Sequence, residues 1–132
     1  MTGVDTSTVN CRPVIRMRIV LRKGVVLGPG KADLLAAIAE HGSIAAAGRS
    51  MDMSYQRAWS LVDELNGYFR SPLVEVSRGG AGRGGARLTA VGREVLETYR
   101  TIEHKAAKQC RTEVESLQQL VSQEDADISD QR

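Results

Sequence analysis

The chain has 132 residues, a length typical of one domain, and 42% of them are hydrophobic, which is enough for a globular core. Residues 1–111 contain 17 Lys and Arg against ten Asp and Glu, whereas residues 112–132 contain one Arg against six acids. A basic body with an acidic tail favours a polyanionic partner. The sequence has no apolar run near the roughly 20 residues of a membrane span and no signal-peptide pattern. Its two cysteines are isolated, so we expect a cytoplasmic protein without a disulfide framework, metal site or cofactor.

Residues 1–12 are polar and aperiodic, which predicts a flexible tail. From Ile15 to Arg22, apolar residues alternate with arginines, and this period of two predicts a half-buried strand. A turn at Lys23-Gly24 allows Val25–Leu27 to return as a second strand. The expected inward-facing residues are Ile15, Met17, Ile19 and Leu21, and the expected outward-facing ones are Arg16, Arg18 and Arg22.

Helical spacing begins after this hairpin and predicts a first helix over Lys31–His41. Pro29 suits the first helical position, where its missing N–H costs nothing. Gly42 is a suitable stop at the C-terminal end. The apolar residues that recur at helical spacing are Leu34, Leu35, Ile38 and Ala39.

Two further helices are predicted on either side of a tight turn. Ser43 and Ser54 can cap them, because a serine hydroxyl accepts a hydrogen bond from an otherwise unpaired amide. Asp52 occupies the turn position that favours a positive φ, where glycine is easiest and Asp or Asn is next best. The small residues of 45–48 permit close approach of another helix. The third helix has an apolar stripe of Ala58, Leu61, Val62 and Leu65.

A pair of strands with a glycine- and arginine-rich loop comes next. Leu73–Val76 reads as one strand and Arg87-Leu88 as its partner. The loop matches GxGxxG over residues 80–85, but a dinucleotide site needs that motif between a strand and a helix. The loop therefore favours a wing that approaches DNA phosphates, with a flexible solvated hairpin loop as the alternative.

Thr89 can cap a long last helix, expected over residues 90–122 and followed by an acidic, disordered tail over 123–132. Its apolar residues form a near-heptad seam, which is typical of dimerisation. The expected dimer-interface residues are Val95, Tyr99, Ile102, Ala106, Val114 and Leu117.

This order of elements predicts a mostly α fold with a small β component, a winged helix-turn-helix over residues 13–89. The third helix is the expected recognition helix, although an ordinary amphipathic surface helix would show the same pattern. The expected base-reading residues are Ser54, Tyr55, Gln56, Arg57 and Ser60. The expected phosphate-contacting residues are Lys31, Ser43, Arg49, Arg78, Arg83 and Arg87.

Several short motifs also resemble a known family. Gly42-Ser43-Ile44, Ser54-Tyr55 with Ala58-Trp59, Glu64-Leu65-Asn66, Leu73-Val74-Glu75, the glycine-rich loop and Leu88-Thr89 are similar to the N-terminal domain of the molybdate-responsive repressor (ModE) family. That domain is related to the LysR-type winged helix. The resemblance covers about Arg16 to Arg100. It implies a bacterial-type transcription regulator that binds double-stranded DNA as a homodimer at a palindromic operator.

The chain also departs from the family pattern. Asp52 replaces the usual turn glycine, and Gln56-Arg57 replaces a different polar pair, so the operator is expected to differ. The family's C-terminal oxyanion-binding module has no counterpart here, so molybdate is not expected to bind this chain directly. A protein-interaction adaptor using the last helix and the acidic tail is the alternative function. An enzyme is not expected, because the sequence shows no constellation of acid, base or metal ligands.

Overall fold

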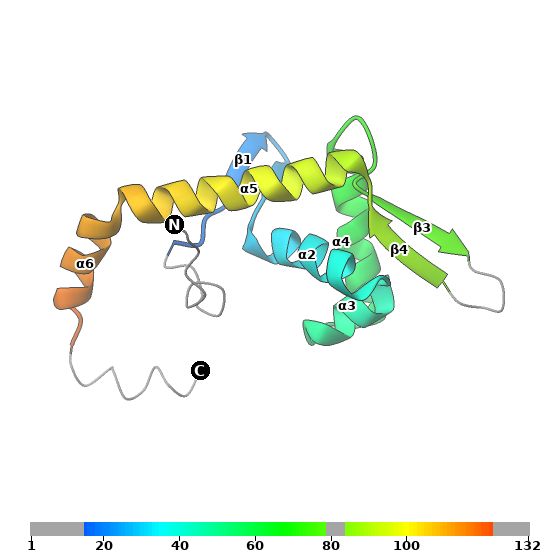
Figure 1. Ribbon diagram of the computed structural model, residues 1–132, viewed down its shortest axis with the longest axis horizontal. Helices are drawn as coiled ribbons and strands as arrows, with labels where there is room; N and C mark the ends of the chain where they lie inside the picture. Colours follow the sequence, from blue (N-terminus) through cyan, green and yellow to red (C-terminus); the bar gives the residue numbers. More distant parts are fainter. Residues whose placement is uncertain (1–14, 79–83, 123–132) are drawn as a thin grey trace. The chain divides into compact units, whose positions relative to one another are not determined.

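The computed structural model describes residues 15–78 and 84–122 of the chain. In chain order the elements are β1 (Ile19–Arg22), β2 (Val25–Leu27), α2 (Pro29–His41), α3 (Ile44–Ser50), α4 (Tyr55–Tyr68), β3 (Val74–Arg78), β4 (Gly84–Leu88), α5 (Ala90–Gln109) and α6 (Arg111–Gln119) (Figure 1). One compact unit is Arg16–Thr101. The second unit includes the end of α5 and all of α6.

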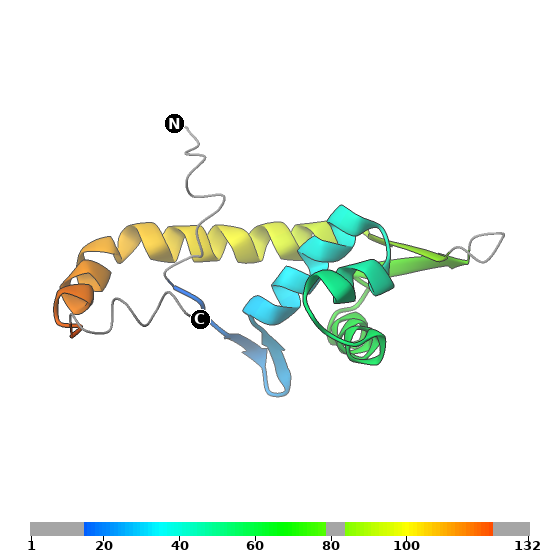
Figure 2. The same ribbon diagram turned by 90° about the horizontal axis from the view of Figure 1, so that it is seen from below.

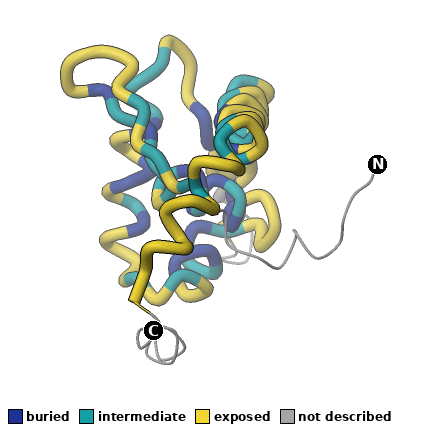
Figure 3. Tube along the Cα trace, turned by 90° about the vertical axis from the view of Figure 1, so that its left-hand side faces the viewer, coloured by how far each residue is buried: buried dark blue, intermediate teal, exposed yellow. Residues whose placement is uncertain are grey.

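The core of the first unit is built by α2, α3 and α4, as the sequence predicts. Leu34, Leu35 and Ile38 of α2 have no exposed surface. The predicted α4 stripe is buried as well, and the strands close the core with Leu73, Val74 and Leu88. Figure 3 shows buried positions in the body of the chain, whereas the helix that precedes the C-terminal grey trace, α6, has no buried residue. The three helices are therefore held by one shared apolar interior.

The predicted helix caps and turn are confirmed. Gly42 ends α2 with φ of 75°, and Oγ of Ser43 accepts from the amide of Ala46 at 3.0 Å. Oγ of Ser54 accepts from the amide of Arg57 at 3.0 Å. Asp52 has φ of 58° in the turn between α3 and α4. These local signals fix the directions in which α3 and α4 leave their connections.

The turn residue gives a first testable prediction. Asp52→Val is expected to lower the free energy of unfolding by about 2 kcal/mol, because a β-branched residue is strained at positive φ. Asp52→Gly is expected to be at least as stable as the wild type, because glycine adopts this conformation without a steric cost. Chemical denaturation of the three proteins measures both effects. Equal stability of the Val and Gly variants would contradict this account of the turn.

The close approach of α3 to α4 depends on Gly48. A Cβ at Gly48 would lie 3.2 Å from the Cβ of Ala58, which is tighter than ordinary packing. The carbonyl of Gly48 also accepts from the amide of Met53 at 2.9 Å. The expectation that small residues permit close helix packing is thus confirmed at this position.

The two hairpins differ in their fit to the prediction. β3 and β4 pair in regular antiparallel register from Val74↔Leu88 to Arg78↔Gly84, so these strands are longer than predicted. In the N-terminal hairpin, β1 begins at Ile19 rather than Ile15, and its register shifts between Val20 and Arg22. Leu21, expected to face inward, is 49% exposed because it lies in this irregularity. The hairpin leads directly into α2 (Figure 2).

The last predicted helix is divided in two. α5 ends at Gln109 and α6 begins at Arg111, with Cys110 at φ of −104° and ψ of 17° between them. The cap at Thr89 is confirmed, since its Oγ1 accepts from the amide of Gly92 at 3.0 Å. The compact unit continues to Thr101, so the beginning of α5 belongs to the winged domain.

Tyr99 does not fit the expected dimer seam. Its side chain is 1% exposed within the core of its own chain, and its hydroxyl donates to the carbonyl of Met17 at 2.7 Å. Val95, on the preceding turn of α5, is half-buried and packs against the same core. These two residues of the heptad pattern therefore serve the fold of the monomer, and Tyr99 is removed from the proposed interface.

Candidate nucleic-acid interface

The predicted base-reading residues lie together on the exposed N-terminal part of α4. All five of them are exposed: Ser54, Tyr55, Gln56, Arg57 and Ser60. The ring of Tyr55 meets that of Trp59 edge to face, with centroids 6.4 Å apart and planes at 82°. Trp59 is half-buried and packs on the core, so this contact connects the exposed ring of Tyr55 to the packed side of α4. The opposite side of the helix is buried, which makes this polar face the one available to a ligand.

Two predicted phosphate contacts lie on or beside α3. Ser43 is half-buried at the N-cap, where its hydroxyl can still donate a hydrogen bond after accepting one from Ala46. Arg49 is exposed in the last turn, and no carboxylate in the described part of the chain pairs with it. Arg49 therefore carries a positive charge that an outside anion can approach.

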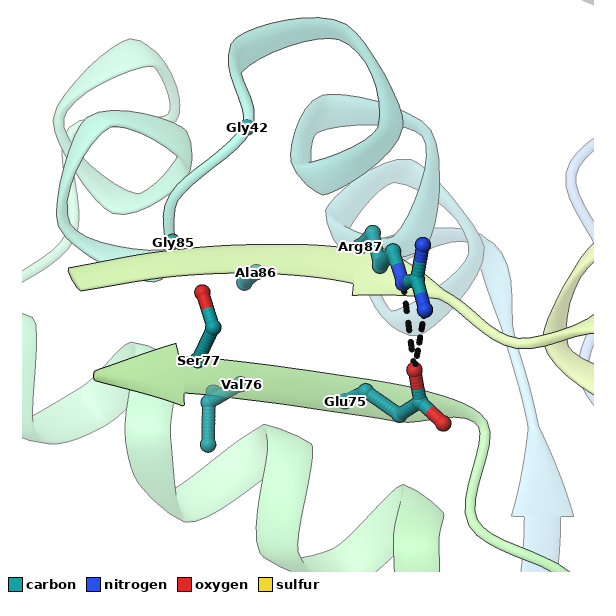
Figure 4. Close-up of a pocket in the computed structure, with 7 residues that line it drawn as sticks. All are labelled: Gly42, Glu75, Val76, Ser77, Gly85, Ala86 and Arg87. Atoms are coloured by element: carbon teal, nitrogen blue, oxygen red, sulfur yellow. Dashed lines mark hydrogen bonds and ion pairs between the residues drawn. The ribbon is translucent and has the colours of Figure 1, made fainter. Parts of the chain in front are cut away.

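Two other predicted phosphate contacts already have partners. Nζ of Lys31 lies 3.4 Å from Oε1 of Glu64 and 5.4 Å from the ring centre of Tyr68. Nε and Nη2 of Arg87 each lie 3.1 Å from Oε1 of Glu75 across the wing (Figure 4). The Arg87–Glu75 pair is exposed, and exposed ion pairs contribute only about 0–1 kcal/mol, so a phosphate can replace Glu75 at small cost. Lys31 is only 20% exposed, so exchange of its partner Glu64 is less easy.

The remaining predicted wing contacts are only partly described. Arg78 is the last residue of β3 and pairs with Gly84. Arg83 and the GxGxxG stretch up to it lie outside the described residues. The strand–loop–strand order is confirmed by β3 and β4, which excludes the strand–loop–helix context that a dinucleotide motif needs.

The wing is fixed to the helix-turn-helix at its base. The amide of Ala86 donates to the carbonyl of Gly42 at 2.8 Å, which joins β4 to the end of α2. A shallow pocket at this junction is lined by both wing strands and Gly42, with Arg87 and Glu75 at one side (Figure 4). Gly85 leaves no spare room there, because a Cβ would lie 3.2 Å from Oγ of Ser77. The wing is thus hydrogen-bonded to the same glycine that ends α2.

The connection between α4 and the wing depends on Asn66, whose role is not predictable from the residues around it. Its Oδ1 accepts from the amides of Leu73 at 2.8 Å and Val74 at 3.1 Å. Its Nδ2 donates to the carbonyl of Val74 at 3.2 Å. The only local sign of this role is a polar residue directly after the buried α4 stripe. The hydrogen-bond partners of Asn66 lie seven and eight residues later, so the residues around it do not predict them.

The sequence also did not indicate the role of Arg18. It was expected on the outward face of the first strand, but it lines a hollow together with Lys31 and Arg57. The alternation pattern predicted its exposure correctly, whereas its proximity to α4 depends on how the hairpin packs.

Residues 15–78 and 84–122 contain no group of three or more His, Cys, Asp or Glu side chains arranged to hold a metal ion. Within the same ranges, no helix has the length and apolar character needed to cross a membrane.

Comparison with known proteins identifies the domain. Residues 31–93 match the family model for the bacterial regulatory helix-turn-helix protein, lysR family. The chain carries a LysR-type helix-turn-helix domain. Its matched range runs from α2 into the first turn of α5 and includes the whole wing.

Curated relatives of this LysR-type domain include molybdenum-related proteins. The chain is 38% identical over 100 residues to the molybdenum-pterin-binding protein MopA of Rhodobacter capsulatus, covering 75% of this chain and 38% of that protein. It is 36% identical over 92 residues to the molybdenum transport protein ModE of Azotobacter vinelandii, covering 70% and 34%. It is 34% identical over 85 residues to the DNA-binding transcriptional dual regulator ModE of Escherichia coli K12, covering 64% and 32%. The chain thus spans about a third of the length of these relatives, and the predicted ModE resemblance is confirmed.

A solved structure supports the fold of the LysR-type domain. The domain in the crystal structure of the CbnR_DBD–DNA complex superposes with a TM-score of 0.52 at 24% identity, covering 67% of this chain and 95% of that chain. The predicted winged helix-turn-helix is therefore confirmed.

Proposed function

We propose that this chain is a sequence-specific DNA-binding transcriptional regulator that acts as a homodimer on a palindromic operator. The exposed N-terminal turns of α4 carry the proposal. Gln56 and Ser60 present hydrogen-bonding side chains on one solvent-facing surface of a helix narrow enough for the major groove. The LysR-type domain and the relatives named as transcription regulators support the same function.

In the proposed complex, α4 lies in the major groove and its neighbours contact the flanking backbone. Arg49 on α3 and Arg87 on the wing provide charges for phosphates, and Ser43 provides a hydroxyl donor. Lys31 is paired with Glu64 and contributes after exchange of that partner. Arg78 and Arg83 keep the same proposed role on the basis of the sequence alone. Phosphate contacts carry no sequence information, but they fix the position of the protein along the duplex. They would therefore set which bases Gln56 can reach.

The homodimer is proposed to form through the exposed apolar residues of the second unit. Ile102 is 38% exposed on α5 and Leu117 is 65% exposed on α6. Ala106 on α5 and Val114 on α6 are half-buried members of the same predicted seam, which the break at Cys110 divides between the two helices. Pairing two copies would set their α4 helices about 34 Å apart, one turn of DNA, which requires a palindromic site.

The names of the relatives suggest a molybdenum context for the regulated genes. We propose that this chain contributes DNA reading to such regulation. DNA affinity measured with and without micromolar molybdate tests whether the oxyanion acts on this chain.

Two substitutions test the division between base reading and backbone contact. Gln56→Ala is expected to change operator preference, costing about 1–3 kcal/mol for the preferred base and little for random DNA. Arg49→Ala is expected to weaken binding to all sequences and to make the salt dependence of log K shallower by about one unit. Fluorescence anisotropy over a series of duplexes and salt concentrations measures both. Unchanged affinity of both variants for every duplex would contradict the proposed docking.

The adaptor function is the second candidate, because α6 exposes Leu117 and the segment directly after it exposes Leu120 and Val121. These exposed apolar side chains could pack against a different protein instead of a second copy of this chain. Random duplex DNA discriminates the two functions, since an adaptor is expected to show little salt-dependent binding and a regulator is expected to bind measurably.

A further inference from the structure

An open hollow of about 320 Å³ lies beside the recognition helix. Three cationic side chains from three different segments line it: Arg18 before β1, Lys31 in α2 and Arg57 in α4. Val26, Met53 and Leu61 form apolar parts of its wall. Since a water molecule occupies about 30 Å³ of liquid, the hollow has room for a phosphate group with several waters.

The positive charge in this hollow is only partly balanced. Lys31 is paired with Glu64 at 3.4 Å, and its side chain is 20% exposed. Arg18 and Arg57 are exposed, and in the described part of the chain neither guanidinium has an ion-pair partner. Two unpaired guanidinium groups line this one hollow. Each is suited to a phosphate, which a guanidinium group can bind through two parallel N–H donors.

Packing holds Arg18 at the hollow. Its Cγ lies against Gly28, where an added Cβ would approach to 3.3 Å. The absence of a side chain at Gly28 therefore leaves space for the aliphatic part of Arg18 next to the beginning of α2. The contact with Gly28 therefore places the side chain of Arg18 at the hollow.

We propose that this hollow seats one phosphate of the DNA backbone, held jointly by Arg18 and Arg57. The inference rests on the proposed DNA-binding function and deepens it. Arg57 belongs to the same exposed end of α4 as Gln56, so DNA that contacts Gln56 passes next to the hollow. Arg57 then contacts the backbone and not a base edge, which changes the role that the sequence predicted for it.

Neutralising single phosphates of the DNA backbone tests this phosphate site directly. Duplexes carrying the operator selected by the wild type would be made with one methylphosphonate at each backbone position in turn. The wild type is expected to lose affinity at one additional phosphate in each half-site, and Arg18→Gln is expected to be insensitive at that phosphate. Arg18→Gln is also expected to reduce the salt slope by about one unit. Arg22→Gln, which removes the same charge from the neighbouring β1, is the matched control and should retain the sensitivity of the wild type.

The role of Arg57 is tested by repeating operator selection. Arg57→Gln is expected to return the wild-type consensus at lower affinity, and the Arg18→Gln/Arg57→Gln double variant is expected to lose less than the sum of the single losses. A changed consensus would show that Arg57 reads a base and would overturn its assignment. Thermal unfolding checks that each variant is folded. Because both side chains are exposed, we expect the midpoint of unfolding to stay close to that of the wild type.

A second arm separates backbone phosphate from the free ion. Inorganic phosphate is titrated into the chain at constant ionic strength, and the Arg18 and Arg57 amide signals are followed by NMR. No saturable shift is expected. A saturable shift without any methylphosphonate effect would assign the hollow to a free anion and overturn the proposal.

The failure of this proposal and the failure of DNA binding are distinguishable. If the wild type binds duplex DNA but Arg18→Gln keeps full methylphosphonate sensitivity, the phosphate site in the hollow is refuted while DNA binding stands. If the wild type binds no duplex, the proposed function fails as well.

Discussion

Gly92→Ala is expected to lower the free energy of unfolding by about 2–3 kcal/mol, with a correspondingly lower midpoint in chemical denaturation. Gly92 lies in the first turn of α5, where a Cβ would collide with the carbonyl oxygen of Leu73. The carbonyl carbon and Cα of Leu73 would also be only 3.0 and 3.2 Å away. Because backbone cannot rotate aside as a side chain can, α5 or the segment before β3 must shift.

Gly67→Ala is the matched control for this prediction. Gly67 is also helical, near the end of α4, but a Cβ there would meet nothing within 4 Å. This variant is expected to gain about 0.5–1 kcal/mol, since alanine loses less backbone entropy in a helix than glycine does. Equal effects of the two substitutions would contradict the contact between α5 and Leu73.

Asn66→Ala is the second large effect, expected at about 2–3 kcal/mol of lost stability. Its Oδ1 serves the amides of Leu73 and Val74, so truncation leaves two donors without their acceptor. An unsatisfied, partly buried donor costs about 1–3 kcal/mol. The same side chain connects α4 to β3, so the variant is also expected to bind DNA more weakly at temperatures where it remains folded.

Gln56→Ala is the control for Asn66→Ala in the stability measurement. It removes a side-chain amide from the same helix, but Gln56 is exposed, and its substitution is expected to change stability by less than about 0.5 kcal/mol. A similar small change for Asn66→Ala would show that its three hydrogen bonds do not hold the wing.

Most of the fold follows from short-range rules that a sequence displays. Ser43, Asp52 and Ser54 each act on backbone within three residues, so residue type alone predicts the cap or turn. The α4 stripe is equally local, because helical periodicity places its members on one face. Exposure of the proposed base-reading residues follows from the same periodicity.

The predictions that failed or were missed depend on distant partners. Tyr99 fits a heptad by spacing, but spacing does not say whether the apolar face meets its own core or a second chain. Arg18 and Asn66 likewise show their partners only after the hairpin and the wing are packed. Arg87 was identified as a wing cation, but its pairing with Glu75 depends on the register of β3 and β4.

The most direct test of the central claim is selection of bound duplexes from a random DNA pool by the intact chain. The account predicts enrichment of a palindrome whose half-sites are centred about one helical turn apart. It also predicts that affinity for the enriched site exceeds affinity for random DNA at the same salt concentration. Recovery of unenriched sequences, or the absence of salt-dependent binding to any duplex, would contradict it.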